Sequence, residues 1–168
     1  VMRHVSTIAM SRTPFLDHLV NERQCLLELL SRMQPRSYHA NDVIVTASFP
    51  VHEMLVLVSG TVTLLVPNER RGENVRIGTL STSDQVRATA SLVFGAEALL
   101  PGAAAPVATT TCIARSDLHC FALSRVEFSG FAGLFPRQVR RVRQSVEEFL
   151  AQKRGQPVVI DMTPATPG

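Results

Sequence analysis

The pattern of apolar and polar residues divides the chain into a helical start, a strand-rich middle and a helical end. Near the start, four apolar residues recur at helical spacing: Leu26, Leu27, Leu30 and Met33. Asn21 followed by Gln24 matches a capping box, and Pro35 cannot continue a helix. This pattern predicts a helix over residues 21–33.

The middle of the chain, residues 38–122, consists of short runs rich in Val, Thr and Leu, separated by turn-forming residues. Such runs are typical of β-strands. The predicted strands are residues 43–46, 54–58, 61–66, 75–80, 109–114 and 119–123. Ser59 and Gly60 lie between two of these runs and predict a tight hairpin. The polar stretch 68–74 predicts a second hairpin loop.

Helical spacing returns near the C-terminus. Ser124 followed by Glu127 is a second capping box, which predicts a short helix carrying Phe128 and Phe131. Pro136 suits the first position of a last helix. That helix has one apolar stripe, formed by Val139, Val142, Val146, Phe149 and Leu150. Because the stripe is apolar, we expect the last helix to cover an apolar surface.

Alternation along the predicted strands indicates which residues form the core. The residues expected to be buried in one common core are Val43, Val45, Leu55, Leu57, Val62, Leu64 and Leu123. They alternate with Ile44, Val56 and Thr63, although the runs are apolar enough for both faces to be partly covered.

Length and composition favour a single intracellular domain. The chain has 168 residues, of which 45% are hydrophobic and 18% charged, so one core suffices and wholesale disorder is excluded. The longest uncharged stretch, residues 98–114, is broken by prolines and predicts no membrane span. Three cysteines lack metal-type or redox spacing: Cys25, Cys112 and Cys120. No signal segment precedes them, and we expect a cytoplasmic setting.

A basic cluster contributes most of the net charge of +3: Arg137, Arg140, Arg141 and Arg143. Such a cluster marks either a surface for nucleic acid or acidic lipid, or a solvated helix face, and the solvated face is favoured. A DNA-binding regulator of this outline would carry a helix-turn-helix after the last helix. The chain continues into a Pro-rich tail instead, so we expect no nucleic-acid partner and no direct membrane insertion.

The segment VFGAEALLPG, residues 93–102, is the most specific one for function. It offers a glycine where the backbone must bend, a carboxylate at Glu97, and a short helical turn whose leading N–H groups would be free. Free N–H groups at a helix start between strands form a natural anion site. Ordinary loop packing explains the same segment equally well.

The order of the elements favours the anion site over ordinary loop packing. Over residues 14–152, this order resembles that of the cyclic-nucleotide-binding domain family. The matching segments are NDVIV (41–45), MLVLVSGTV (54–62), Phe94-Gly95 with Ala98-Leu99-Leu100, and HCFALSRVEF (119–128). In that family they are a strand after a turn, a long central hairpin, a phosphate-binding cassette, and the last strand with its entry into a helix.

The resemblance implies an α+β fold: an antiparallel eight-stranded β-roll, jelly-roll-like, with N-terminal helices and two C-terminal helices. It implies a domain over residues 15–154, an N-terminal segment over 1–14 and a Pro-rich tail over 155–168. A single roll and the Leu134-Phe135-Pro136 stretch make channel regulatory domains look closer than kinase regulatory subunits. The implied partners are a cyclic nucleotide, cAMP or cGMP, and other domains of a larger parent protein. A channel is one candidate for this parent protein. In that case the domain is the cytosolic part of a membrane protein.

The cassette departs from the family pattern at two positions. The family places a glutamate directly after Phe-Gly to take the ribose hydroxyl, whereas this chain has Ala96 there and Glu97 one residue later. The family also places an arginine before the next strand, where it forks onto the cyclic phosphate. Ala108 occupies that position. The implied ligand-binding residues are Phe94, Gly95, Glu97, Ala98, Leu99, Leu100, Ala108, Thr109 and Thr110.

The missing cation is not restored by realignment, because no lysine or arginine lies between Arg87 and Arg115. Arg87 belongs to residues 81–92, which are longer than the family's usual turn. This insertion either folds back to supply a cation or is a plain surface loop, and the loop is favoured.

Two functions therefore stay open: a regulatory ligand-sensing domain with weak or altered nucleotide binding, and a ligand-free interaction or scaffold domain that keeps the roll. In the ligand-free case, we expect Phe149 or Leu150 to fill space near Leu99 and Val107. A cupin-type enzyme would need clustered metal ligands. The histidines are dispersed at His4, His18, His39, His52 and His119, so we expect neither a metal nor an enzyme.

Overall fold

The computed structural model describes residues 13, 15–68, 73–81, 93–102 and 104–155. The predictions for the N-terminal segment before residue 13, for Arg87 with most of its insertion, and for the tail after residue 155 lie outside these residues.

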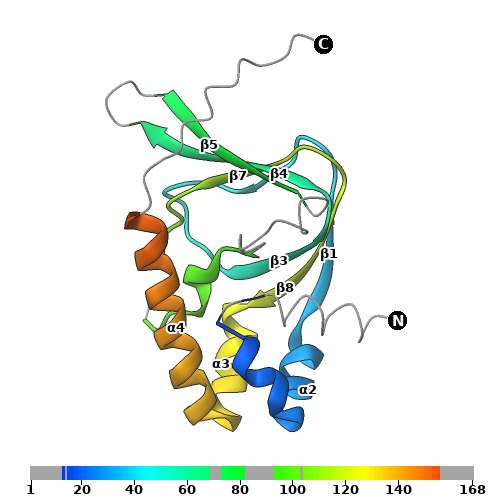
Figure 1. The fold of residues 1–168 in the computed structure, drawn as a ribbon, viewed down its shortest axis with the longest axis vertical. Coiled ribbons are helices and arrows are strands. Elements are labelled where there is room, and N and C mark those ends of the chain that lie inside the picture. Colours follow the sequence, from blue (N-terminus) through cyan, green and yellow to red (C-terminus); the bar gives the residue numbers. More distant parts are fainter. Residues whose placement is uncertain (1–12, 14, 69–72, 82–92, 103, 156–168) are drawn as a thin grey trace.

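Eight strands form two four-stranded sheets, and every pairing is antiparallel (Figure 1). The first sheet has the order β1-β8-β3-β6, with β1 Gln34–Tyr38, β3 Glu53–Ser59, β6 Val93–Phe94 and β8 Leu118–Ser124. The second sheet has the order β2-β7-β4-β5, with β2 Val43–Val45, β4 Thr61–Asn68, β5 Glu73–Ser81 and β7 Thr111–Ala114. The predicted antiparallel β-roll is confirmed, and the described residues contribute eight strands to it.

The predicted tight hairpin at Ser59 and Gly60 is wrong. β3 pairs with β6 and β8, whereas β4 pairs with β5 and β7, so the turn carries the chain from one sheet to the other. Gly60 has φ +116°, and a Cβ there would lie 2.7 Å from the Asp117 carbonyl oxygen. Glycine therefore allows the sharp change of direction. The second predicted hairpin is confirmed for its strands, because β4 and β5 pair from Thr61 to Asn68.

The helices lie together on one side of the roll (Figure 1). In chain order they are the 3₁₀ helix η1 Asp17–Asn21, α2 Arg23–Arg32, the 3₁₀ helix η3 Ala96–Leu99, α3 Arg125–Leu134 and α4 Pro136–Gly155. The predicted N-terminal and C-terminal helices are thus present. η3 occupies the position of the cassette helix.

The start of α2 differs from the prediction. Asn21 ends η1, and the residue before α2 is Glu22, which makes no side-chain capping hydrogen bond. The capping box at Asn21 is therefore wrong. Leu27 belongs to the predicted stripe but is 45% exposed, because the buried face of α2 is formed by Cys25, Leu26 and Leu29.

The C-terminal helices follow the sequence closely. Ser124 Oγ accepts a hydrogen bond of 3.0 Å from the Glu127 N–H, which confirms the second capping box. α4 begins at Pro136, and its predicted stripe faces inward. Val139, Val142, Val146 and Leu150 are buried, and the half-buried Phe149 meets Phe15 edge-on with 5.5 Å between ring centroids.

The core divides into two main clusters, so the prediction of one common core is wrong. Leu55 and Leu57 of β3 point into the roll, whereas Met54 and Val56 point toward the helices. The cluster inside the roll comprises Leu55, Leu57, Val62, Phe94, Cys112, Ala114, Leu118, Cys120 and Ala122.

Most of the predicted core residues are nevertheless inside. Leu55, Leu57 and Val62 are buried in the roll as predicted, and Leu123 is buried in the helix-facing cluster. Val45 and Leu64 are half-buried. Val43 is 56% exposed, so its assignment to the core is wrong.

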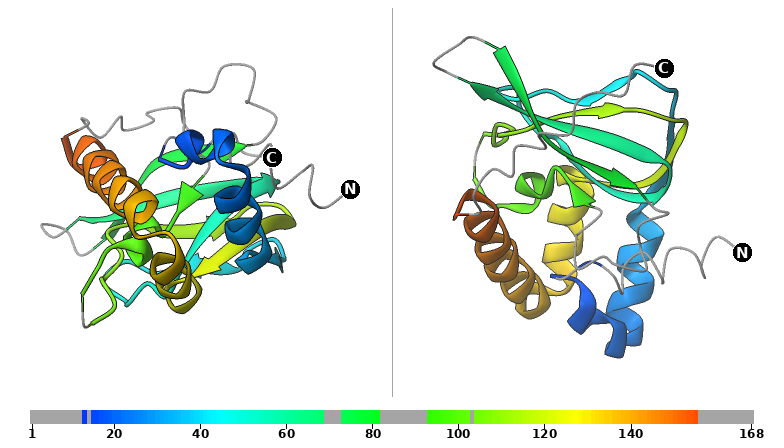
Figure 2. Two further views of the ribbon diagram at one scale, coloured as in Figure 1. Left: turned by 90° about the horizontal axis from the view of Figure 1, so that it is seen from below. Right: turned by 45° about the horizontal axis from the view of Figure 1, so that its top comes forward.

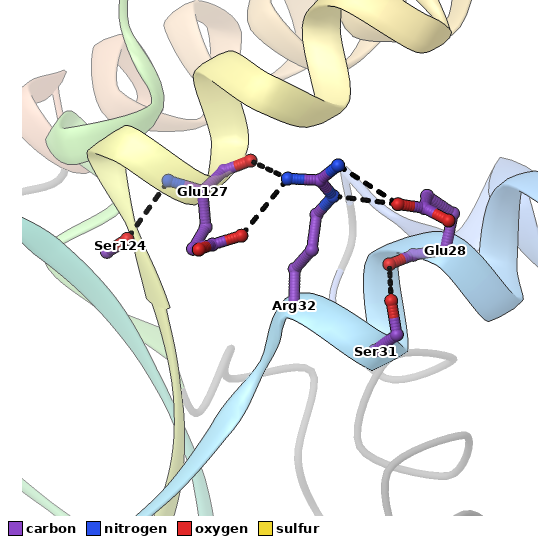
Figure 3. Close-up of polar contacts among 5 residues, drawn as sticks. All are labelled: Glu28, Ser31, Arg32, Ser124 and Glu127. Carbon is purple, nitrogen blue, oxygen red and sulfur yellow. Dashed lines mark hydrogen bonds and ion pairs between the residues drawn. The ribbon is translucent and has the colours of Figure 1, made fainter.

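A charged cluster joins α2 to α3 (Figure 3). Arg32 Nε donates to Glu28 Oε1 at 3.0 Å, and Arg32 Nη1 donates to Glu127 Oε2 at 3.1 Å and to the Glu127 carbonyl oxygen at 3.4 Å. A Cβ at Gly130 would lie 2.5 Å from Arg32 Nη1. The glycine thus leaves room for the guanidinium to lie across α3.

Ser124→Ala should lower the free energy of unfolding by about 1 kcal/mol, because the Glu127 N–H loses its cap. Urea denaturation followed by circular dichroism measures the change. Ser129→Ala is the matched control, since Ser129 is exposed on the same helix and makes no side-chain hydrogen bond within the described part of the chain. Equal stabilities of the two variants would contradict a role for the cap.

Candidate functional site

The candidate site is built around the stretch from β6 to η3. β6 pairs with β3 through Leu55 opposite Phe94 and Val56 opposite Val93. This pairing brings η3 out between the roll and the helices, next to α4 (Figures 1 and 2). The cassette therefore contacts both the roll, through β3, and the C-terminal helices α3 and α4.

Gly95 lets the chain turn from β6 into η3. It has φ +70°, a conformation that L side chains rarely adopt. A Cβ at this position would lie 2.7 Å from the Glu53 carbonyl oxygen and 3.0 Å from Val51 Cγ1. Both the backbone angle and the close approach to the start of β3 require glycine.

The N–H groups that the sequence left free are partly engaged inside the cassette. The Ala98 N–H donates to the Gly95 carbonyl at 3.0 Å, and the Leu100 N–H donates to the Glu97 carbonyl at 3.1 Å. Glu97 is half-buried, and its carboxylate has no hydrogen-bonding or ion-pairing partner among the described residues. The carboxylate is thus the cassette's unengaged polar group.

Ala108 lies in a small apolar cluster with Val51 and Ala98 and is only 5% exposed. Its N–H donates to the Phe49 carbonyl at 2.9 Å, and its own carbonyl accepts from the Ser48 N–H at 2.8 Å. The position that the resemblance aligns with the family's phosphate-pairing arginine is therefore apolar and closely packed. The Ala98 end of the cassette and Ala108 lie together, as the resemblance implies.

The other predicted site residues are divided between the cores and the surface. Phe94 belongs to the core of the roll, while Leu99 is fully buried in the helix-facing core with Leu100 packed against it. Thr109 is exposed and Thr110 half-buried. These assignments as ligand contacts stay predictions.

The expected contact between α4 and the cassette is partly realised. Leu150 and Leu99 belong to the same buried cluster, and Phe149 packs against it. Val107 is 55% exposed, so it is not the predicted neighbour of those side chains. The antiparallel bridge between Val107 and Pro50 holds it on the surface.

Two arginines that sequence reasoning missed contact the cassette from the C-terminal helices. Arg125 Nη1 donates to the Leu100 carbonyl at 2.8 Å and to the Ala98 carbonyl at 3.5 Å. Arg143 Nε donates to the Leu99 carbonyl at 3.2 Å, and its guanidinium lies 5.6 Å above the centre of the Phe128 ring. No local pattern signals these contacts, because both arginines are distant from the cassette in sequence.

Arg125 also fixes the loop that follows the cassette helix. Its Nη2 donates to the Gly102 carbonyl and, at 3.2 Å, to the Ala104 carbonyl. One guanidinium thus holds carbonyl groups spread over residues 98–104. These carbonyls lie at and beyond the C-terminal end of η3, where a positive charge is favourable.

The described residues offer little for metal or thiol chemistry. No group of three or more His, Cys, Asp or Glu side chains among them could hold a metal ion. Burial raises the pKa of Cys120 to about 12 and, together with the Glu22 charge, that of Cys25 to about 11. Both thiols are therefore protonated near neutral pH. In the same part of the chain, none of the helices has the length and apolarity needed to cross a membrane.

The two four-stranded sheets, the short cassette helix and the two closing helices define the cyclic-nucleotide-binding-domain fold, and comparison with solved structures confirms it. No family model and no curated protein matches the sequence. The N-terminal domain of a transcriptional regulator from Streptomyces coelicolor matches with a TM-score of 0.64 and 16% identity, over 93% of this chain and 99% of that one.

Two longer proteins share the fold. The catabolite activator protein of Thermus thermophilus matches with a TM-score of 0.63 and 19% identity, over 84% of this chain and 60% of that one. A triple mutant of the regulatory subunit of a cAMP-independent protein kinase A from Trypanosoma brucei, bound to cAMP in its A site, matches with a TM-score of 0.62 and 17% identity. That match covers 93% of this chain and 48% of the kinase subunit.

Gly95→Ala should destabilise the domain by about 1 to 3 kcal/mol, because the methyl group meets backbone at a positive φ. Thermal and urea denaturation measure the effect. Gly133→Ala is the matched control: it lies in α3, a Cβ there meets nothing within 4 Å, and alanine should stabilise the helix by up to about 1 kcal/mol. A Gly95→Ala variant as stable as the natural protein would contradict the strained turn.

Proposed function

We propose that this chain is a ligand-sensing regulatory domain whose cassette binds cyclic nucleotides weakly. The proposal rests chiefly on Ala108, which lies buried among apolar side chains at the position of the family's phosphate-pairing arginine. The cassette keeps its glycine turn and short helix, and Glu97 keeps an unengaged carboxylate. The frame for a nucleotide is thus retained without its main cation.

The size of the expected defect follows from the missing interaction. A hydrogen bond to a charged group contributes about 1.5 to 3 kcal/mol, which corresponds to about one to two decades of affinity. The Trypanosoma brucei structure supports this reasoning by analogy: it is a cAMP-bound mutant of a cAMP-independent kinase subunit, and one of its three substitutions replaces threonine with arginine.

We propose a regulatory role and no catalysis, because the solved structures named above are regulators and a regulatory subunit. They are parts of a kinase assembly and of transcription regulators, so they give no support to a channel as the parent protein. The channel assignment and cGMP as ligand stay predictions. The chain spans about half of the kinase subunit, and its partners within a larger protein are part of this proposal.

Ala108→Arg should strengthen cAMP binding by about ten- to hundredfold, because the guanidinium can pair with the cyclic phosphate. Isothermal titration calorimetry of both proteins measures the difference, and melting curves without ligand establish that the variant folds. Ala104→Arg is the control, since it adds the same charge at an exposed position of the same segment. Submicromolar affinity in the natural protein, or an equal gain in the control, would overturn the proposal.

A ligand-free interaction or scaffold domain is the second candidate. It is favoured by the packing of α4, whose Val142 and Val146 are fully buried in one cluster with Leu99. A helix already closed over the cassette needs no ligand to hold it. A ligand could still act by its different affinities for closed and open states.

Hydrogen exchange of residues 139–150 separates the two candidates. If the domain senses cyclic nucleotides, millimolar cAMP should change the exchange of these amides, because binding to one state shifts the population. The Ala108→Arg variant should respond at concentrations about ten- to hundredfold lower. Exchange that neither cAMP nor cGMP alters in either protein would leave the scaffold function standing.

A further inference from the structure

A small cavity lies on the outer side of the cassette, between η3, α3 and α4. It measures about 120 Å³ and is lined mainly by Leu99, Leu100, Gly102, Arg125, Ser129 and Arg143. Ala98 also lines the cavity and belongs at the same time to the cluster with Val51 and Ala108 on the proposed nucleotide side of the cassette. Its polar lining side chains, Arg125, Ser129 and Arg143, are not among the ligand-binding residues that the resemblance implies.

Two guanidinium groups line this cavity without a neutralising partner. Neither Arg125 nor Arg143 forms an ion pair within the part of the chain that the structure describes. Arg143 uses its Nε on the Leu99 carbonyl, and its two Nη groups have no protein acceptor among the described residues. Two like charges in one cavity repel each other and favour an anion between them.

The guanidiniums are also held in place before any ligand arrives. Arg125 contacts the Leu100 carbonyl and Arg143 contacts the adjacent Leu99 carbonyl, so neighbouring residues of one short segment position both groups. The Phe128 ring supports Arg143 from below. Donors whose positions are fixed in advance lose little conformational entropy on binding.

We propose that this cavity binds a small oxyanion of the phosphate type. Its volume of about 120 Å³ leaves room for a phosphate group. Charge-assisted hydrogen bonds from the two Nη groups of Arg143 would hold the oxygens. The Nη groups of Arg125 already donate to backbone carbonyls, so this side chain would contribute chiefly its positive charge. Ser129, which is exposed on α3 at the rim, would add a hydroxyl donor.

Binding there has a mechanical consequence that does not depend on cyclic nucleotides. Arg125 begins α3 and Arg143 lies in the middle of α4, so an oxyanion shared by both would join the two helices across the cassette segment. It would favour the state in which α4 is packed on η3. The site thus stabilises the closed arrangement from outside the roll.

Inorganic phosphate is the probe for the first experiment. The melting temperature is measured as sodium phosphate replaces sodium chloride at constant ionic strength, which keeps general screening unchanged. We expect a phosphate-dependent rise in the natural protein, because ligand binding to the native state stabilises it. Arg143→Gln should weaken the apparent affinity for phosphate by about ten- to hundredfold.

Arg140→Gln is the matched control, because it removes the same charge from an exposed position of the same helix. It should keep the full response to phosphate. The proposal is wrong if the natural protein shows no response, or if the two variants respond alike. Since each response is measured against the same variant in chloride, a loss of baseline stability in Arg143→Gln does not confuse the result.

A second variant tests the site without removing an arginine. Ser129→Asp places a carboxylate at the rim of the cavity and should abolish the response to phosphate by occupying the guanidiniums. Gly133→Asp adds the same charge one turn along α3, where a Cβ meets nothing within 4 Å, and should leave the response intact. Amide NMR shifts identify the place of binding: phosphate should move Gly102 and Ser129, and shifts confined to Val51 and Ala108 would overturn the assignment.

Discussion

The burial of β3 on both faces is the constraint on which the rest of the structure depends. Leu55 and Leu57 face the interior of the roll, while Met54 and Val56 face the helices. Because successive side chains of a strand point to opposite faces, one strand serves two cores. β3 also pairs with β6, and Gly95 turns against its first residue, Glu53. The roll, the cassette and the helical layer therefore share one support.

The cassette itself is held unevenly. On the helix side, Arg125 and Arg143 engage the carbonyls of residues 98–100, and Leu99 is buried with the stripe of α4. On the roll side, the contacts of Ala98 are with small apolar side chains, Val51 and Ala108. Among the described residues, the arginines that contact the cassette thus approach from the helices and not from the side of Ala108.

Sequence reasoning succeeded where one local signal decides the structure. The cap at Ser124 and the stripe of α4 are set by side chains that are close together in sequence, and both appear as predicted. It failed where the outcome depends on distant partners. β1 was missed because its residues, Gln34–Tyr38, are polar or exposed and the described strand that it pairs with is β8, which lies far along the chain. The Gly60 turn was misread because a corner between sheets and a hairpin have the same local signature.

In the candidate site, too, features set by neighbouring residues were predicted, and features that depend on distant residues were not. The glycine turn at Gly95 was recognised from the sequence, because it falls within one short segment. The two arginines were not, because only the folded chain brings α3 and α4 beside the cassette. Val43 shows the same limit: its apolar character predicts burial, but β2 is at the edge of its sheet and leaves that side chain 56% exposed.

The way in which Arg125 holds its loop has a consequence for how this segment can vary. Within the part of the chain that the structure describes, the hydrogen bonds of the guanidinium all go to backbone carbonyls, those of Ala98, Leu100, Gly102 and Ala104. Backbone recognition is indifferent to the side chains that the loop carries. Exposed positions such as Pro101 and Ala104 are therefore free to exchange one side chain for another during evolution or design, while the arginine that fixes their path is not. Side chains with new chemical properties can therefore be introduced into this loop without changing its backbone path.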